Sequence, residues 1–169
     1  ITLMPTNLYG PGDNYNKQNS HVLPSLIRKF MEAIENKSGF VNCWGTGKPL
    51  REFLHVQDLG EASVFCLENW DPNEVNAPKD KFGLPLNWLN VGSGDEISIK
   101  NLAIKISNIL DYKGEILWDK TKPDGTIRKK LTIEKIKELG WSPKINLDDG
   151  LKSTIDNYKK EKLKNKLRI

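Results

Sequence analysis

The chain has 169 residues, of which 37% are hydrophobic and 28% are charged, and its formal net charge is +4. This length is enough for one domain with a buried core, and no apolar run approaches the roughly 20 residues that cross a bilayer. The only cysteines, Cys43 and Cys66, form neither a disulfide framework nor a metal site with histidines at suitable spacing, so we expect a protein of the reducing cytoplasm.

The first predicted element is a strand over Thr2–Met4, followed by a polar loop over 5–19 and an amphipathic helix. Because the chain starts within this strand and without an initiating methionine, we expect it to be a fragment of a longer protein. The helix is predicted from apolar residues three and four positions apart, with Pro24 tolerated in the opening turn. Its apolar stripe is expected to consist of Leu23, Ile27, Phe30 and Ile34.

Two further strands, Phe40–Trp44 and Glu52–Val56, flank a turn that contains two glycines. A second helix follows Gln57. We expect its buried face to consist of Leu59, Ala62, Cys66 and Leu67. The stretch Asp71–Asn87 contains three prolines and is predicted to be a surface excursion, because the strand after it belongs to the same core.

The same alternation continues in the second half of the chain. Strands are predicted over Trp88–Val91 and Glu115–Trp118, with a helix after Ser98, a residue type that favours the N-cap position. Alternating strands and helices predict an α/β fold. We find no internal repeat and treat residues 1–169 as a single unit.

Two helices complete the prediction. One runs from Thr132 to a C-terminal cap at Gly140, and the last begins near Asn146. Residues Leu151–Ile169 contain seven basic and two acidic side chains, so this terminal helix accounts for the positive net charge. We expect a solvated lysine-rich helix that frays, and the alternative is a tail that binds nucleic acid or an anionic membrane.

Polar loops beyond the strands contain the candidate ligand-binding residues, since ligands of open α/β sheets bind at the carboxyl ends of strands. Trp44 offers an aromatic face and Arg51 a rigid fork for phosphate. Arg128 and Lys129 follow a turn that contains Asp124, which adds cations and one carboxylate. Such a set would suit a nucleoside diphosphate. The alternative is that Trp44 is part of the core and the cations are solvated.

His21 lies where the first polar loop meets the first helix, and a neutral imidazole there could accept a proton. It could equally be an ordinary polar residue at a helix start. His55, within a strand, is better explained as a buried and hydrogen-bonded side chain. The sequence contains no glycine-rich loop for a dinucleotide pyrophosphate. Tyr158 and Lys162 have the spacing of a catalytic pair, but the many lysines of the terminal helix make this match a coincidence.

Several longer strings of residues occur in one order along nearly the whole chain. They are Met4–Pro11, Gly10–Asn14, Asn19–Pro24, Trp44–Val56, Asn90–Gly94, Tyr112–Gly114, Lys122–Thr126 and Arg128–Lys129. Together these strings resemble the GDP-L-fucose synthase family of extended short-chain dehydrogenases/reductases. The context of His21 and the string that begins at Lys122 are the most specific of them.

This resemblance implies an NADPH-dependent enzyme that inverts C3 and C5 of GDP-4-keto-6-deoxymannose and then reduces its C4 ketone. It implies an α/β fold that is the C-terminal, substrate-binding part of such an enzyme, with the last strands of a Rossmann-type sheet. The N-terminal NADP-binding Rossmann half would be absent from this chain. The implied ligands are NADP(H) and a GDP-sugar, with no metal, nucleic acid or membrane. The full-length protein would be a homodimer.

The resemblance also assigns roles to individual residues. His21 matches the family's acid/base histidine, whose partner cysteine lies upstream and is therefore neither Cys43 nor Cys66. Lys29 departs from the arginine of some members, which keeps the charge but loses bidentate geometry. The segment that lines the cofactor is matched by Pro5, Thr6, Asn7 and Leu8, together with His21. The positions around the GDP-sugar are matched by Lys29, Trp44, Arg51, Asp124 and Lys129.

Two other functions stay open from the sequence. One is a different nucleotide-sugar epimerase, dehydratase or reductase of the same superfamily. The other is a non-enzymatic domain that binds a nucleotide-sugar, or a polyanion through its basic terminal helix.

Overall fold

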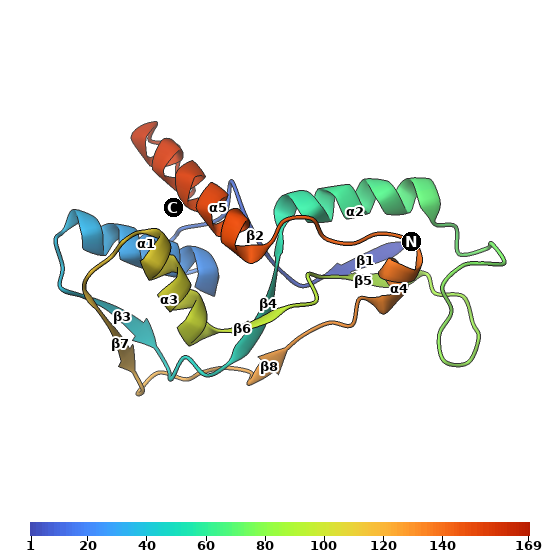
Figure 1. The fold of residues 1–169 in the computed structure, drawn as a ribbon, viewed down its shortest axis with the longest axis horizontal. Coiled ribbons are helices and arrows are strands. Elements are labelled where there is room, and N and C mark those ends of the chain that lie inside the picture. The colour runs from blue at the N-terminus through green and yellow to red at the C-terminus, as the bar shows by residue number, and fades with distance from the viewer.

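The computed structural model describes residues 1–169, which form an elongated α/β molecule with two hydrophobic cores that meet at strand β4 (Figure 1). The strands are β1 (Thr2–Pro5), β2 (Asn7–Tyr9), β3 (Phe40–Trp44), β4 (Leu50–His55), β5 (Trp88–Val91), β6 (Glu96–Ser98), β7 (Glu115–Asp119) and β8 (Arg128–Lys129). The helices are α1 (Val22–Glu35), α2 (Val56–Asn69), α3 (Ile99–Ile109), α4 (Glu134–Glu138) and α5 (Leu147–Leu163).

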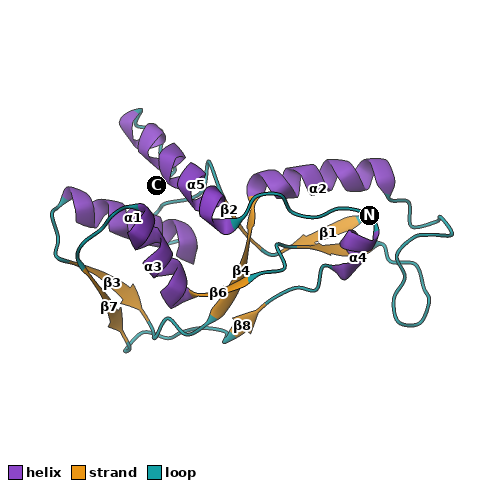
Figure 2. Ribbon diagram, in the orientation of Figure 1, coloured by secondary structure: helices purple, strands orange, loops and turns teal.

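The strands form three small sheets, and most of their pairs are parallel (Figure 2). Strand β1 pairs with β5, and β3 pairs with β7, both in parallel. Strand β4 is central, because β2 and β8 pair with it in parallel and β6 pairs with it in antiparallel orientation. Parallel pairs joined through helices are typical of α/β proteins, so the predicted fold class is confirmed.

The two cores lie on opposite sides of β4. The larger core combines apolar side chains of α1, α3, α5 and β3, and the smaller core combines those of α2, α4 and β5. Neighbouring strand residues point to opposite faces, so Phe53 belongs to the larger core and Leu54 to the smaller one. Strand β4 therefore holds the two halves of the molecule together.

All five predicted strands and all five predicted helices are present, with ends that differ by a few residues. Two apolar assignments were wrong. Ile34 is 40% exposed and Leu67 is 75% exposed, because each lies at the border of its helical stripe, where no other element covers it. Val56 also differs from the prediction, since it begins α2 instead of ending β4.

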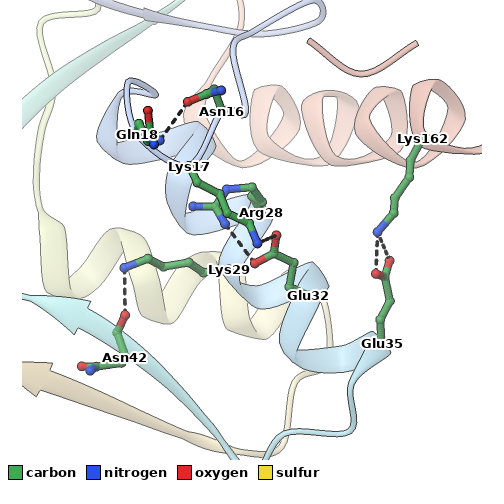
Figure 3. A network of polar contacts seen from close by, with 9 residues as sticks. All are labelled: Asn16, Lys17, Gln18, Arg28, Lys29, Glu32, Glu35, Asn42 and Lys162. Atoms are coloured by element: carbon green, nitrogen blue, oxygen red, sulfur yellow. Dashed lines mark hydrogen bonds and ion pairs between the residues drawn. The ribbon is translucent and has the colours of Figure 1, made fainter. Parts of the chain in front are cut away.

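The terminal helix is docked on the protein, which corrects the expectation of a solvated, fraying helix. Leu151, Ile155 and Tyr158 are buried in the larger core, and the ammonium group of Lys162 pairs with the carboxylate of Glu35 on α1 (Figure 3). Burial raises the pKa of Tyr158, whereas a catalytic tyrosine of this spacing would need a lowered pKa. None of the helices combines the length and the apolar composition that a membrane crossing requires.

Candidate functional site

A cavity of about 940 Å³ opens beside the start of α1 and strand β4. Its size is within the range of small-molecule sites, at roughly 300–1,000 Å³. Five segments contribute to it: the stretch from the end of β1 into β2, the loop after β2, the start of α1, strand β4 and the stretch that begins with β8. The lining residues are Pro5, Thr6, Asn7, Leu8, Asp13, His21, Val22, Leu23, Arg51, Phe53, Arg128, Lys129, Lys130 and Leu131.

His21 lies at this cavity because it is the N-cap residue of α1. Its backbone is extended, and its side chain makes no capping hydrogen bond to the helix. The imidazole is exposed, so both ring nitrogens are available to a ligand. His21, a potential proton-transfer group, therefore lines the same cavity as residues 5–8, the segment that is predicted to contact the cofactor.

Asp13 is a cavity residue that the sequence analysis did not single out. Its Oδ1 accepts the backbone N–H of Asn14 at 2.7 Å, while its buried Oδ2 has no partner. Burial raises the pKa of this carboxyl group, and the hydrogen bond from Asn14 partly offsets the effect. The signal in the sequence that could have identified Asp13 is its position within the string Gly10–Asn14.

Arg51 and Lys129 give the cavity its free positive charge. They are partners in the β4–β8 register, and neither forms an ion pair with a carboxylate. The Nη1 of Arg51 donates to the carbonyl of Leu50 at 2.7 Å, which leaves most of the guanidinium donors open. Arg128, in contrast, is neutralised by two hydrogen bonds to Glu96, at 2.7 and 2.6 Å. Arg51 and Lys129 are therefore the cations best placed to bind a phosphate group.

Trp44 and Lys29 do not line this cavity. The indole of Trp44 is 65% exposed, and the ammonium nitrogens of Lys29 and Lys122 each lie 5.7 Å from the centre of its ring. The Nζ of Lys29 donates to the backbone carbonyl of Asn42 at 2.8 Å (Figure 3), and burial lowers the pKa of this lysine. Trp44 thus forms a separate exposed aromatic surface flanked by two cations.

Asp124 also lies outside the cavity lining, and its carboxylate is occupied by protein donors. The backbone N–H and the hydroxyl of Thr46 each donate to it at 2.6 Å. Its Oδ1 lies against Gly45, whose φ of 74° suits a glycine, and a Cβ there would lie 2.2 Å from this oxygen. The carboxylate therefore fixes the turn that follows Trp44.

The hydrogen bonds from Thr46 hold the pKa of Asp124 below its usual value. This carboxylate should therefore stabilise the turn at every pH above its ordinary pKa, and the effect should be lost as the pH falls through the lowered pKa. We expect Asp124→Asn to release the turn at neutral pH. The amide resonance of Thr46 in an NMR titration reports both changes. Asp119→Asn, which removes a similar contact to Thr121, serves as the control and should leave Thr46 unchanged.

His55 is 4% exposed, which agrees with the predicted buried imidazole. Its Nδ1 accepts the N–H of Gln57 at 3.3 Å and so caps α2, but its Nε2 has no partner. The prediction of a buried and hydrogen-bonded imidazole is therefore confirmed, with one ring nitrogen left without a partner. Burial lowers the pKa of His55, in keeping with a neutral ring that accepts a hydrogen bond at Nδ1.

Comparison with known proteins gives consistent relatives. Residues 1–77 match the NAD dependent epimerase/dehydratase family. GDP-L-fucose synthase 1 from Arabidopsis thaliana is 48% identical over 160 residues, which are 95% of this chain and 46% of that protein. The crystal structure of a GDP-L-fucose synthetase from Naegleria fowleri bound to NADP matches with a TM-score of 0.82 and 25% identity, over 99% of this chain and 47% of the other.

A third relative is named for a different GDP-linked keto-sugar. The crystal structure of a GDP-6-OMe-4-keto-L-xylo-heptose reductase from Campylobacter jejuni has a TM-score of 0.79 and 33% identity, and the match covers 95% of this chain and 54% of that chain. The chain spans about half the length of the curated relatives it matches. It therefore has the fold of the extended short-chain dehydrogenases/reductases, and over nearly all of its own length it resembles the GDP-L-fucose synthases.

Proposed function

We propose that this chain provides the GDP-sugar-binding part of an NADP-dependent epimerase/reductase that converts GDP-4-keto-6-deoxymannose to GDP-L-fucose. The observation that carries the proposal is one cavity that contains His21, the unpaired cations Arg51 and Lys129, and the segment 5–8. The cations suit the diphosphate, and the imidazole suits proton transfer at the sugar. The names of the Arabidopsis and Naegleria relatives support this choice of substrate.

In the proposed reaction, protons next to the C4 ketone are removed and returned on the opposite face at C3 and C5. His21 would serve as the acid/base group, because it is exposed to the cavity and makes no capping contact. Arg51 and Lys129 would hold the diphosphate and so place the sugar beside His21. NADPH, when bound, supplies the hydride that reduces the C4 ketone.

We propose that Pro5, Thr6, Asn7 and Leu8 form the cofactor wall of the cavity. Asn7 and Thr6 are held in place by the carbonyl of Glu52, so this wall is preformed. The glycine-rich pyrophosphate loop would belong to an N-terminal half of the full-length protein. In this proposal the full-length protein is a cytoplasmic homodimer.

Trp44, Lys29 and Asp124 have a less direct place in the proposal. Trp44 with its two lysines would receive a part of the substrate that extends beyond the cavity, and Asp124 would act by fixing the turn beside Trp44. A base that stacks on the indole while its diphosphate contacts Arg51 would join the two places. This arrangement keeps all five predicted substrate residues in one extended site.

A second candidate is a reductase for a different GDP-linked keto-sugar, favoured by the match to the Campylobacter jejuni enzyme. Both candidates share the diphosphate site and differ in the sugar. Assays of the full-length protein with GDP-4-keto-6-deoxymannose and with keto-heptose substrates separate them. UDP- and dTDP-linked keto-sugars in the same assay test the choice of nucleotide.

The proposal predicts that Arg51→Ala weakens GDP binding by about 10- to 100-fold, which corresponds to the roughly 1.5–3 kcal/mol of a hydrogen bond to a charged group. Arg51→Lys should lie between Ala and wild type, because it keeps the charge and loses the fork. Isothermal titration calorimetry with GDP measures the change. The control is Lys113→Ala, which removes an exposed cation that pairs with Asp111 and does not line the cavity. Equal binding by wild type and Arg51→Ala would contradict the proposal.

A further inference from the structure

Glu52 is a charged side chain with no exposed surface, in the middle of β4. Its Oε1 accepts the backbone N–H of Gly94 at 2.8 Å, and its Oε2 accepts that of Leu131 at 2.9 Å. Its backbone carbonyl accepts the side chains of Asn7, at 2.8 Å, and Thr6, at 3.3 Å. One residue thus holds three segments that are distant in the sequence.

These three segments are connections between the two halves of the molecule. Thr6 joins β1 to β2, which begins at Asn7, Gly94 lies between β5 and β6, and Leu131 lies between β8 and α4. Strand β5 and helix α4 belong to the smaller core, whereas β2, β6 and β8 pair with β4. Figure 1 shows β4, β6 and β8 side by side between the two halves. Glu52 therefore lies at the point where the chain crosses from one half to the other.

Two of these segments form walls of the cavity, and Gly94 lies outside its lining. Thr6 and Asn7 line one side, and Leu131 continues the cationic stretch 128–131 on the other side. Arg51 and Phe53 line the cavity from β4, but Glu52 between them does not. Neighbouring strand residues point to opposite faces, so the carboxylate of Glu52 acts from behind the walls.

The fit around this carboxylate is close. A Cβ added to Gly92 would lie 2.2 Å from the Oε1 of Glu52, so only a glycine leaves room for the carboxylate at this position. Both carboxylate oxygens are used, and a buried carboxylate needs such partners because an unpaired buried charge is strongly unfavourable. The site is built for a carboxylate with two acceptors.

We infer that Glu52 is a positioning residue of the GDP-sugar cavity: it touches no ligand and fixes the cofactor wall at 5–8 relative to the cationic wall at 128–131. This inference rests on the proposed function. Glu52→Gln keeps the size of the side chain but retains only one acceptor oxygen, and its NH₂ group would face a backbone N–H. Because the close fit at Gly92 leaves the side chain little room to turn, this repulsion would weaken both contacts. The wall at 128–131 would be released, and Lys129 would lose its fixed place opposite the segment 5–8.

Asp58 offers a matched control. It is another buried carboxylate, 1% exposed, and it accepts the backbone N–H groups of Lys144 and Ile145, both at 3.1 Å. Lys144 and Ile145 line a different cavity of about 480 Å³. Asp58→Asn therefore removes a similar pair of hydrogen bonds without touching the walls of the GDP-sugar cavity.

The test measures GDP binding by calorimetry, thermal stability and amide hydrogen exchange for wild type, Glu52→Gln and Asp58→Asn, at a temperature where all three are folded. We expect both variants to lose stability, but Glu52→Gln to bind GDP at least about tenfold more weakly than Asp58→Asn. Exchange should increase at Gly94 and Leu131 in Glu52→Gln only. If Glu52→Gln does not fold, Gly92→Ala presses on the same carboxylate and should give the same exchange pattern.

The possible results distinguish the positioning role of Glu52 from the proposed binding of a GDP-sugar. Equal GDP affinity in Glu52→Gln and Asp58→Asn, or unchanged exchange at Leu131, would overturn the inference about Glu52. A wild-type protein that fails to bind GDP would overturn the proposed function, while the exchange data would still decide whether Glu52 holds the walls. Weak binding by Glu52→Gln with local exchange at both segments supports the positioning role.

Discussion

His21→Asn is expected to slow epimerisation by the full-length protein by about 10²- to 10⁴-fold, the usual contribution of a positioned acid or base. The substitution suits the site because asparagine is a favoured N-cap residue, and His21 makes no side-chain bond that would be lost. The helix should therefore keep its stability. Incorporation of solvent deuterium at C3 and C5 of the sugar, followed by NMR, measures the loss directly.

GDP binding separates a chemical role of His21 from a structural one. In the proposed function the diphosphate is held by Arg51 and Lys129, so His21→Asn should bind GDP nearly as well as wild type. His55→Asn is the control, because His55 caps α2 from a buried position and contributes to stability, not to proton transfer. Undiminished deuterium incorporation in His21→Asn would remove this residue from the mechanism.

Much of the fold follows from local signals. Ser98 was predicted to cap a helix, and its Oγ accepts the N–H of Asn101 at 3.1 Å. Asn146 was placed at the start of the last helix, and its Oδ1 accepts the N–H of Asp149 at 3.0 Å. Such signals lie within a few residues of one another, so they can be read without knowledge of the tertiary structure.

Strands β2, β6 and β8 were missed because they contain only two or three residues and exist through pairing with β4. No local pattern marks them. The same reason hides the contacts of Glu52, whose side-chain partners Gly94 and Leu131 are 42 and 79 residues away in the sequence. Asp124 reaches Thr46 across 78 residues. Long-range hydrogen bonds of this kind decide how the cavity is built.

Trp44 shows how far the sequence alone can predict the role of a candidate site residue. Its aromatic ring and its neighbours Lys29 and Lys122 can be identified as ligand-binding types from the sequence, but their position relative to a cavity depends on where β3 lies. Strand β3 pairs with β7, in a sheet separate from that of β4. Residue type was therefore informative, whereas distance from His21 required the tertiary structure.

Phe30→Ala is expected to lower the free energy of unfolding by about 3–5 kcal/mol, the typical cost of removing a buried phenylalanine. Phe30 has no exposed surface, and its ring lies 5.4 Å from the ring of Tyr112 in an edge-to-face arrangement. The hydroxyl of Tyr112 donates to the carbonyl of Ser38 at 2.9 Å, so the tyrosine cannot simply move into the space. The truncation would leave a cavity at the contact of α1 and α3.

Ile34 provides the comparison, because it belongs to the same predicted stripe of α1 but is 40% exposed. Ile34→Ala should cost only about 1–2 kcal/mol, since much of its apolar surface already contacts water. Urea denaturation with an unchanged m-value gives both free energies. Equal losses would mean that the stripe is uniformly buried, as helical periodicity alone predicts. A larger loss for Phe30 would show that tertiary contacts, and not helical periodicity alone, set the cost along α1, the helix that carries His21 at its start.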